Sequence, residues 1–228
     1  MKFDRIVGLG DSWMWGDELV DPRLPAQSHA TDSQNTSYRE AHCFLGQLGR
    51  HYNVPTDNLG WPGGSLQLCI YNYIWWQDQP STCENPLFLV ALTDAGRVSW
   101  YNPRHVIYHN DPPWNRFVHN TWLRNGSGNY GHEWHQLNKL HDTLSDCQQL
   151  RLLNYKQTVM FFQACCAGRV LMFNTGPQPG VMDSPNLLWP NQTLRGLVPH
   201  DHFKSLGHPN ETGHEIIRDL LIPYIDML

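Results

Sequence analysis

The chain has 228 residues, which is enough for one sizeable domain with a full hydrophobic core. Its net charge is −5 with the histidines neutral, so the sequence lacks the basic surface that nucleic-acid binding requires. No apolar run approaches the roughly 20 residues of a membrane-spanning helix. We therefore expect neither nucleic acid nor a membrane as a partner.

Signals for export and for disulfide formation are also missing from the sequence. The N-terminal segment shows no apolar region of the kind found in signal peptides. The six cysteines include no CxxC pair and no regular spacing, which indicates reduced thiols. We therefore expect a cytoplasmic protein.

The first half of the sequence alternates between two patterns. Short apolar runs that end at Gly or turn residues are typical of buried parallel strands, and apolar residues at helical spacing follow them. Ser37 and Glu40 have the spacing of a capping box, which predicts that a helix begins there. The patterns predict strands over residues 4–9, 54–59 and 87–92, and helices over 38–51 and 65–77.

The second half begins with a stretch that has no clear period. Residues 95–132 form an aromatic-rich insertion, in which side chains from Trp100 to Trp122 are scattered among Pro, Asn and His. A loop of this length is usually a lid or a binding segment. Beyond it, the sequence predicts helical structure over 133–167, a strand over 170–173, a loop over 174–202 and an amphipathic helix over 209–228.

The alternation of strands and helices predicts a single domain over residues 1–228 with a three-layer α/β/α architecture and a mostly parallel sheet. Open sheets of this kind place their chemistry at the carboxyl ends of the strands. Four stretches that could take part in catalysis follow predicted strands or precede the last helix. They are Gly10-Asp11-Ser12, the Gly-rich turn over residues 58–65, Thr93-Asp94, and His208 with Pro209.

These stretches, in this chain order, resemble the SGNH (GDSL-type) hydrolases. The resemblance implies a flavodoxin-like α/β/α sandwich that hydrolyses esters, often acetyl or other acyl groups on glycans or lipids. It implies that the partner is a small-molecule or glycan ester and that no metal or organic cofactor is needed. The oligomeric state is not predicted.

The resemblance also implies a role for each matched residue. Ser12 matches the nucleophile, and its backbone N–H matches one donor to the oxyanion. Gly63 matches the glycine that supplies a second N–H, with Gly60 as the alternative if the register shifts. A glycine N–H can approach the developing charge closely because no Cβ intervenes. His208 matches the general base.

Two positions depart from the family pattern. Thr93 stands where the family has an Asn that donates to the oxyanion, and a Thr hydroxyl has a shorter reach. Ser205 stands where the family has an Asp three residues before the catalytic His, and the nearest upstream acid is Asp201. Three outcomes stay open: a Ser–His dyad oriented by Ser205 or a backbone carbonyl, an acid supplied by Asp201 or from elsewhere in the chain, or an inactive scaffold.

The substrate pocket is expected to include Asp11, Trp13, Asp94 and Arg97, which lie beside the matched motifs. Two of these residues have a plainer alternative. Asp11 can cap a helix that begins at Ser12, and Arg97 can form an ordinary salt bridge instead of meeting an anionic group of the substrate.

Two classes of function therefore remain. One is a serine hydrolase that cleaves a carboxylic ester, for example an O-acetyl group on a saccharide. The other is a binding or structural protein that keeps the fold, and because similar short chains occur in bacteriophages, this alternative includes a location in the virion. His132 and His135, with His141 and Cys147, could hold a metal on a helix. Their spacing is not that of HExxH, and we expect a solvated helix face instead.

Overall fold

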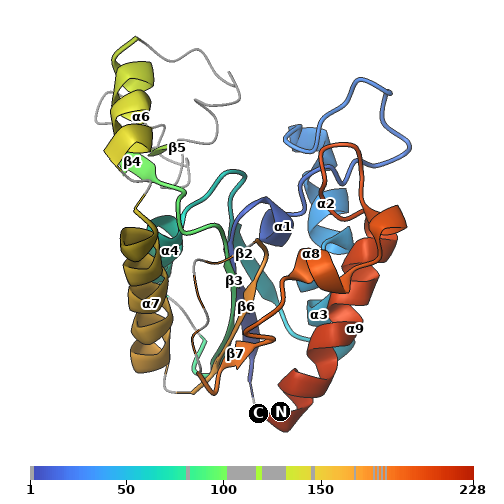
Figure 1. The fold of residues 1–228 in the computed structure, drawn as a ribbon. Coiled ribbons are helices and arrows are strands. Elements are labelled where there is room, and N and C mark those ends of the chain that lie inside the picture. The colour runs from blue at the N-terminus through green and yellow to red at the C-terminus, as the bar shows by residue number, and fades with distance from the viewer. Residues whose placement is uncertain are drawn as a thin grey trace.

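The computed structural model describes residues 3–80, 83–101, 117–119, 132–144, 147–166, 168–176, 178, 180, 182 and 184–228. A five-stranded parallel sheet runs through its centre (Figure 1). The strand order is β2-β1-β3-β6-β7, which is a flavodoxin-like order. The strands are β1 (Arg5–Gly10), β2 (Thr56–Gly60), β3 (Pro86–Leu92), β6 (Val170–Asn174) and β7 (Leu187–Leu188). The predicted α/β fold with a mostly parallel sheet is confirmed.

Helices cover both faces of the sheet, so the fold has three layers: helices, sheet and helices (Figure 1). The strands are buried on both sides because their apolar residues alternate between two core clusters. In β1, Ile6 faces the cluster that includes Phe44, whereas Val7 faces the cluster that includes Tyr155. Helices α3 (Phe44–Tyr52) and α9 (Glu211–Met227) cover the first face, and α4 (Leu66–Gln77) and α7 (Gln148–Cys165) cover the second.

The helix predicted over residues 38–51 is interrupted in the structure. Cys43 is extended, with φ −65° and ψ 153°, and it separates α2 (Thr36–His42) from α3. The expected capping box is also wrong, because Asn35 occupies the N-cap position and makes no side-chain cap bond there. Its amide group is engaged elsewhere: it donates to the carbonyls of Leu19 and Ala30 and accepts from the N–H of Asp21.

The second half contains more short elements than the sequence predicts. The predicted helical stretch over 133–167 divides into α6 (His132–Leu144) and α7. The predicted loop over 174–202 contains β7, helix α8 (Leu194–Leu197) and a 3-10 turn (His200–His202). These elements have two to four residues, too few for a sequence period to show.

The aromatic-rich insertion predicted over 95–132 lies mostly outside the described residues. Its described part contains an antiparallel pair of strands, β4 (Ser99–Tyr101) and β5 (Phe117–His119), which the sequence did not predict. Residues 102–116 and 120–131, which include Trp122, are not described. No helix in the described part of the chain is both long and apolar enough to cross a membrane.

Candidate active site

Ser12 begins a very short helix directly after β1. Asp11 caps this helix, α1 (Ser12–Trp15), by accepting the N–H of Trp13 at 3.1 Å, and Gly16 ends it in the left-handed conformation with φ 85°. A Cβ at Gly10 would lie 2.7 Å from the Cβ of Ala91, so a glycine is needed where β1 passes β3. Because β2 and β3 flank β1 on opposite sides, Ser12 stands at the point where the strand order reverses, the usual binding crevice of such sheets.

His208 reaches Ser12 from the turn that precedes α9. The N–H of Lys204 donates to the carbonyl of His208 at 2.8 Å, and Gly207 permits the tight turn through its φ of 86°. Asn210 then caps α9 by accepting the N–H of Gly213 at 2.9 Å. This arrangement places Nε2 of His208 2.9 Å from Oγ of Ser12.

Glu18 supplies a carboxylate on the other side of the ring. Its Oε2 lies 3.0 Å from Nδ1 of His208 and accepts the backbone N–H of the same residue at 3.2 Å. Its Oε1 accepts from the N–H of Leu206 at 3.2 Å and from Oγ of Ser205 at 3.3 Å. Glu18 has a φ of 64°, a conformation that costs about 1–3 kcal/mol in a residue other than glycine and that is often found at functional sites.

The acid predicted from the sequence is not the one beside the ring. Asp201 is exposed over 79% of its side chain and lies 3.8 Å from Nε2 of His202 rather than near His208. Ser205 bonds to Glu18 and not to the ring. The carboxylate beside the ring belongs to Glu18, which lies elsewhere in the chain.

A second carboxylate faces the nitrogen that contacts Ser12. Oδ2 of Asp17 lies 3.8 Å from Nε2 of His208, while its Oδ1 accepts the N–H of Glu18 at 3.1 Å. Burial raises the pKa of Asp17, and the charge of His208 partly opposes this rise. Consecutive residues thus place one carboxylate at each ring nitrogen, and the sequence analysis identified neither.

Asp11 and Arg97, two of the residues expected in the substrate pocket, bind each other. The carboxylate of Asp11 is 2% exposed and accepts from Nη1 of Arg97 at 2.9 Å and from the hydroxyl of Thr175 at 3.2 Å. These contacts join the residues that follow β1, β3 and β6. Arg97 therefore takes the plain salt-bridge alternative, and Asp11 is a helix cap in a buried network.

The other two expected pocket residues also make structural contacts. Trp13 is buried, and its ring packs against Phe203 with 5.5 Å between the ring centroids. Asp94 accepts the N–H of Gly96 at 2.7 Å, which closes the turn after β3. All four side chains thus make contacts within the fold, and their expected place in a substrate pocket stays a prediction.

Thr93 and Gly63 are the expected oxyanion donors from other segments. Thr93 follows β3 and has no exposed surface, and within the described part of the chain its hydroxyl has no hydrogen-bond partner. Gly63 lies in the turn after β2 with a φ of 76°, which only glycine adopts easily. The alternative donor, Gly60, gives its N–H to Oδ1 of Asn58 at 3.1 Å.

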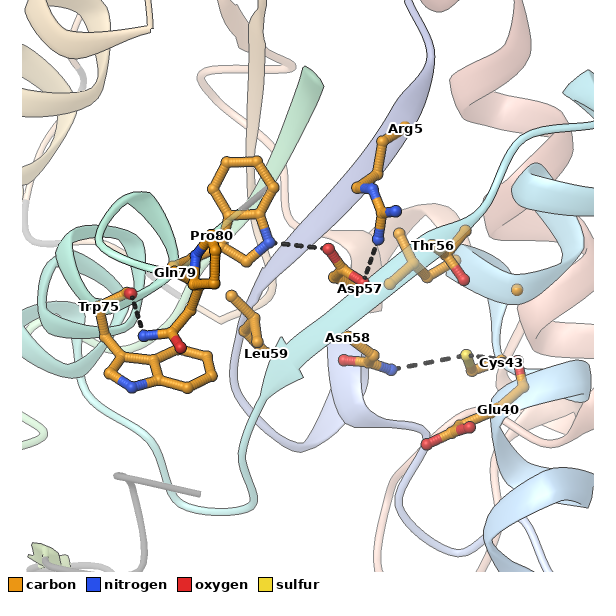
Figure 2. Close-up of a pocket in the computed structure, with 13 residues that line it drawn as sticks. Arg5, Glu40, Cys43, Thr56, Asp57, Asn58, Leu59, Trp75, Gln79 and Pro80 are labelled. Carbon is orange, nitrogen blue, oxygen red and sulfur yellow. Dashed lines mark hydrogen bonds and ion pairs between the residues drawn. The ribbon is translucent and has the colours of Figure 1, made fainter. Parts of the chain in front are cut away.

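A cavity of about 500 Å³ lies along the outer edge of β2, and its lining does not include Ser12, Glu18 or His208. Asp57, which lines this cavity, accepts from Arg5 at 2.8 Å (Figure 2) and from the indole of Trp76 at 2.7 Å. Nowhere in the described ranges do three or more His, Cys, Asp or Glu side chains gather as they would around a metal ion.

No protein-family model matches the sequence, and no curated protein matches it significantly. Several solved structures are similar to the chain. A lipolytic G-D-S-L family protein from Veillonella parvula has 16% identity and a TM-score of 0.40, over 98% of this chain and 99% of that one. A putative G-D-S-L protein from Desulfitobacterium hafniense has 13% identity and a TM-score of 0.37, over 95% and 96%. A family two carbohydrate esterase from Clostridium thermocellum, solved with cellohexaose, has 12% identity and a TM-score of 0.44, over 99% and 64%. The G-D-S-L family is the one that the motifs of this sequence resemble.

Proposed function

We propose that this chain is a serine hydrolase that cleaves carboxylic esters. The observation that carries the proposal is the line of two hydrogen-bond contacts from Ser12 through the ring of His208 to Glu18, at 2.9 Å and 3.0 Å. A hydroxyl, an imidazole and a carboxylate in this order form the arrangement that activates a serine nucleophile. His208 lies 196 residues from Ser12 and 190 residues from Glu18 in the sequence, so local chain geometry alone does not account for their meeting.

The proposed reaction begins with attack of Oγ of Ser12 on the acyl carbon. As the Oγ–C bond forms, His208 takes the proton at Nε2, and Glu18 stabilises the resulting imidazolium at Nδ1. Collapse of the tetrahedral intermediate breaks the bond to the leaving oxygen, which receives the proton from Nε2. Water then attacks the acyl-enzyme with the same histidine as base, and this step releases the acid and restores Ser12.

The proposed oxyanion hole consists of the N–H groups of Ser12 and Gly63 and the hydroxyl of Thr93. Ser12 is the first residue of α1, so its N–H has no acceptor within the helix. Thr93 offers a buried hydroxyl without a partner in the described structure. A preorganised donor of this kind is typically worth about 10²–10³ in rate. The mechanism uses no metal or organic cofactor.

The substrate that we propose is a small O-acyl ester, above all an acetyl ester of a saccharide, as the family resemblance implies. The proposal for the reaction does not depend on this choice, because any accessible acyl carbon near Ser12 could enter the same steps. A simple chromogenic ester therefore suffices to test the chemistry.

Labelling with a fluorophosphonate and hydrolysis of p-nitrophenyl acetate test the proposal. Both should be lost in Ser12→Ala and in His208→Ala. Ser37→Ala and His135→Ala are the matched controls, because both residues are exposed and lie outside the site, and these variants should keep both signals. If the wild-type protein shows neither labelling nor turnover, the alternative of a non-catalytic binding or structural protein is correct.

A further inference from the structure

The carboxylate of Asp17 occupies a place beside the reacting atoms that the proposed mechanism leaves unused. Its Oδ2 lies 3.8 Å from Nε2 of His208, the same nitrogen that lies 2.9 Å from Oγ of Ser12. The side chain of Asp17 is 26% exposed, whereas that of Glu18 is 11% exposed. Asp17 is thus the more accessible of the two carboxylates beside the ring.

The orienting role does not fall to Asp17, because Nδ1 is engaged by Glu18. A separation of 3.8 Å is also too long for a hydrogen bond to the ring at rest. Oδ1 has a local task, since it accepts the N–H of Glu18. Oδ2 is therefore the carboxylate oxygen available to a substrate.

The chemistry at Nε2 determines which part of a substrate comes close to Oδ2. The leaving oxygen must come within hydrogen-bond distance of Nε2 to receive its proton. A hydroxyl on the carbon next to the ester-bearing carbon lies about one hydrogen-bond length from that leaving oxygen. Such a hydroxyl can therefore donate to Oδ2 of Asp17 while the leaving oxygen contacts His208.

We infer that Asp17 is a specificity residue that accepts a hydrogen bond from a hydroxyl adjacent to the ester oxygen of the leaving alcohol. The inference rests on the proposed esterase function and narrows its substrates to esters of alcohols that carry a neighbouring hydroxyl. Burial raises the pKa of Asp17, so the folded chain keeps a carboxylate where ionisation is disfavoured. Retention of an unfavourable group next to the reacting atoms is typical of a residue that serves function.

Two esters of nearly equal shape test the inference. In 2-hydroxyethyl acetate the leaving alcohol carries a neighbouring hydroxyl, and in 2-methoxyethyl acetate the same oxygen can no longer donate. Wild-type protein should prefer the hydroxyethyl ester about 10- to 100-fold in kcat/KM, the range expected for a hydrogen bond to a charged acceptor. Because both rates are measured on one protein, a partly unfolded preparation does not change their ratio.

Two variants and one control complete the test. In Asp17→Ala the ratio should fall to within about threefold of one. In Asp17→Asn the amide oxygen should keep the bond to the N–H of Glu18, which turns the amide N–H group towards the substrate. A hydroxyl and an ether oxygen can both accept from this group, so the ratio should again fall to within about threefold of one. Asp201→Asn, at an exposed position, should keep the wild-type ratio.

Each remaining outcome contradicts the inference. A wild-type ratio near one, an unchanged ratio in Asp17→Ala, or turnover of p-nitrophenyl acetate without turnover of the hydroxyethyl ester would overturn the role of Asp17 alone. Absence of turnover on all three esters in wild-type protein would instead overturn the proposed function, and the inference with it.

Discussion

The carboxylate of Glu18 accepts hydrogen bonds from both the ring and the backbone of His208, at 3.0 Å from Nδ1 and 3.2 Å from the backbone nitrogen. A carboxylate acceptor at Nδ1 favours the tautomer that carries the ring proton there, and this tautomer leaves Nε2 to accept from Ser12. The same carboxylate also anchors the turn that carries the ring. The charge of Glu18 and its anchoring contacts should therefore have separable effects.

Glu18→Gln should lower kcat about 10²–10⁴-fold with little change in KM, because a neutral amide neither stabilises the imidazolium nor enforces the tautomer. Steady-state hydrolysis of p-nitrophenyl acetate measures this effect. Glu18→Ala also removes the contacts to Ser205 and Leu206, and it should lower the free energy of unfolding by about 1–3 kcal/mol. Asp201→Asn is the control for both measurements. A kcat for Glu18→Gln within about threefold of wild type would exclude Glu18 as the orienting acid.

The variant Thr93→Val tests whether the hydroxyl of Thr93 contributes to catalysis or only to the stability of the fold. The hydroxyl of Thr93 is buried without a partner in the described structure, so its removal should leave the free energy of unfolding unchanged or raise it by about 1 kcal/mol. If the hydroxyl donates to the oxyanion, kcat/KM should fall about 10²-fold or more.

The matched control for this substitution is Thr158→Val in α7. Thr158 is also buried, but its hydroxyl donates to the carbonyl of Asn154 at 2.9 Å. This variant should lose about 1 kcal/mol of stability and keep full activity. Full activity in Thr93→Val would remove Thr93 from the oxyanion hole.

The sheet could be predicted from the sequence because its strands are continuous apolar runs. In β3, the residues from Leu87 to Leu92 are buried on both faces, so hydrophobicity alone marks the strand. Cys43 shows the opposite case. The helix breaks there, and a Cβ at Gly46 would clash with the carbonyl oxygen of Glu40, so the apolar period hides a break that only this glycine marks.

The candidate site could be predicted only where its residues lie in compact motifs. Ser12 and His208 each follow or precede a recognisable turn, and the structure brings them together. Glu18 contacts a residue 190 positions away in the sequence, and no pattern spans that separation. The one available signal was the pair of acidic residues shortly after the serine, in the polar stretch that follows Gly16.

Arg97→Met should destabilise the fold by about 3–5 kcal/mol, because it leaves the carboxylate of Asp11 buried at 2% exposure without its ion-pair partner. Denaturation by urea measures the loss. The double variant with Asp11→Asn should recover part of it, since the buried charge is then absent. Arg218→Met, in the partly exposed pair with Asp219, should cost only about 0.2–1 kcal/mol. Equal losses in the two arginine variants would mean that the Asp11–Arg97 pair does not hold the site together.

Two buried histidines should make the fold sensitive to acid. Burial lowers the pKa of both His119 and His214 to about 3, from an ordinary value of 6.5. Between these two values the unfolded chain binds protons that the folded chain does not. The free energy of unfolding should therefore fall as the pH drops below about 6.5, by up to about 1.4 kcal/mol per pH unit for each histidine. Asp17 acts in the opposite sense, because its raised pKa lets the folded state bind a proton more readily than the unfolded chain.

His214→Gln isolates one of the two contributions. Nδ1 of His214 accepts the N–H of Phe44 at 3.3 Å, and the side-chain carbonyl of Gln can replace this acceptor without a group that titrates. Urea denaturation at pH 7, 6, 5 and 4 gives the free energy of unfolding at each pH. Between pH 6 and pH 4 this free energy should fall less steeply with acid in the variant, by about 1.4 kcal/mol per pH unit, which corresponds to one proton. His135→Gln, at an exposed position on α6, should leave the slope unchanged. An unchanged slope in His214→Gln would mean that His214 is protonated in the folded state, and its burial would then need a compensating acceptor for the second ring nitrogen.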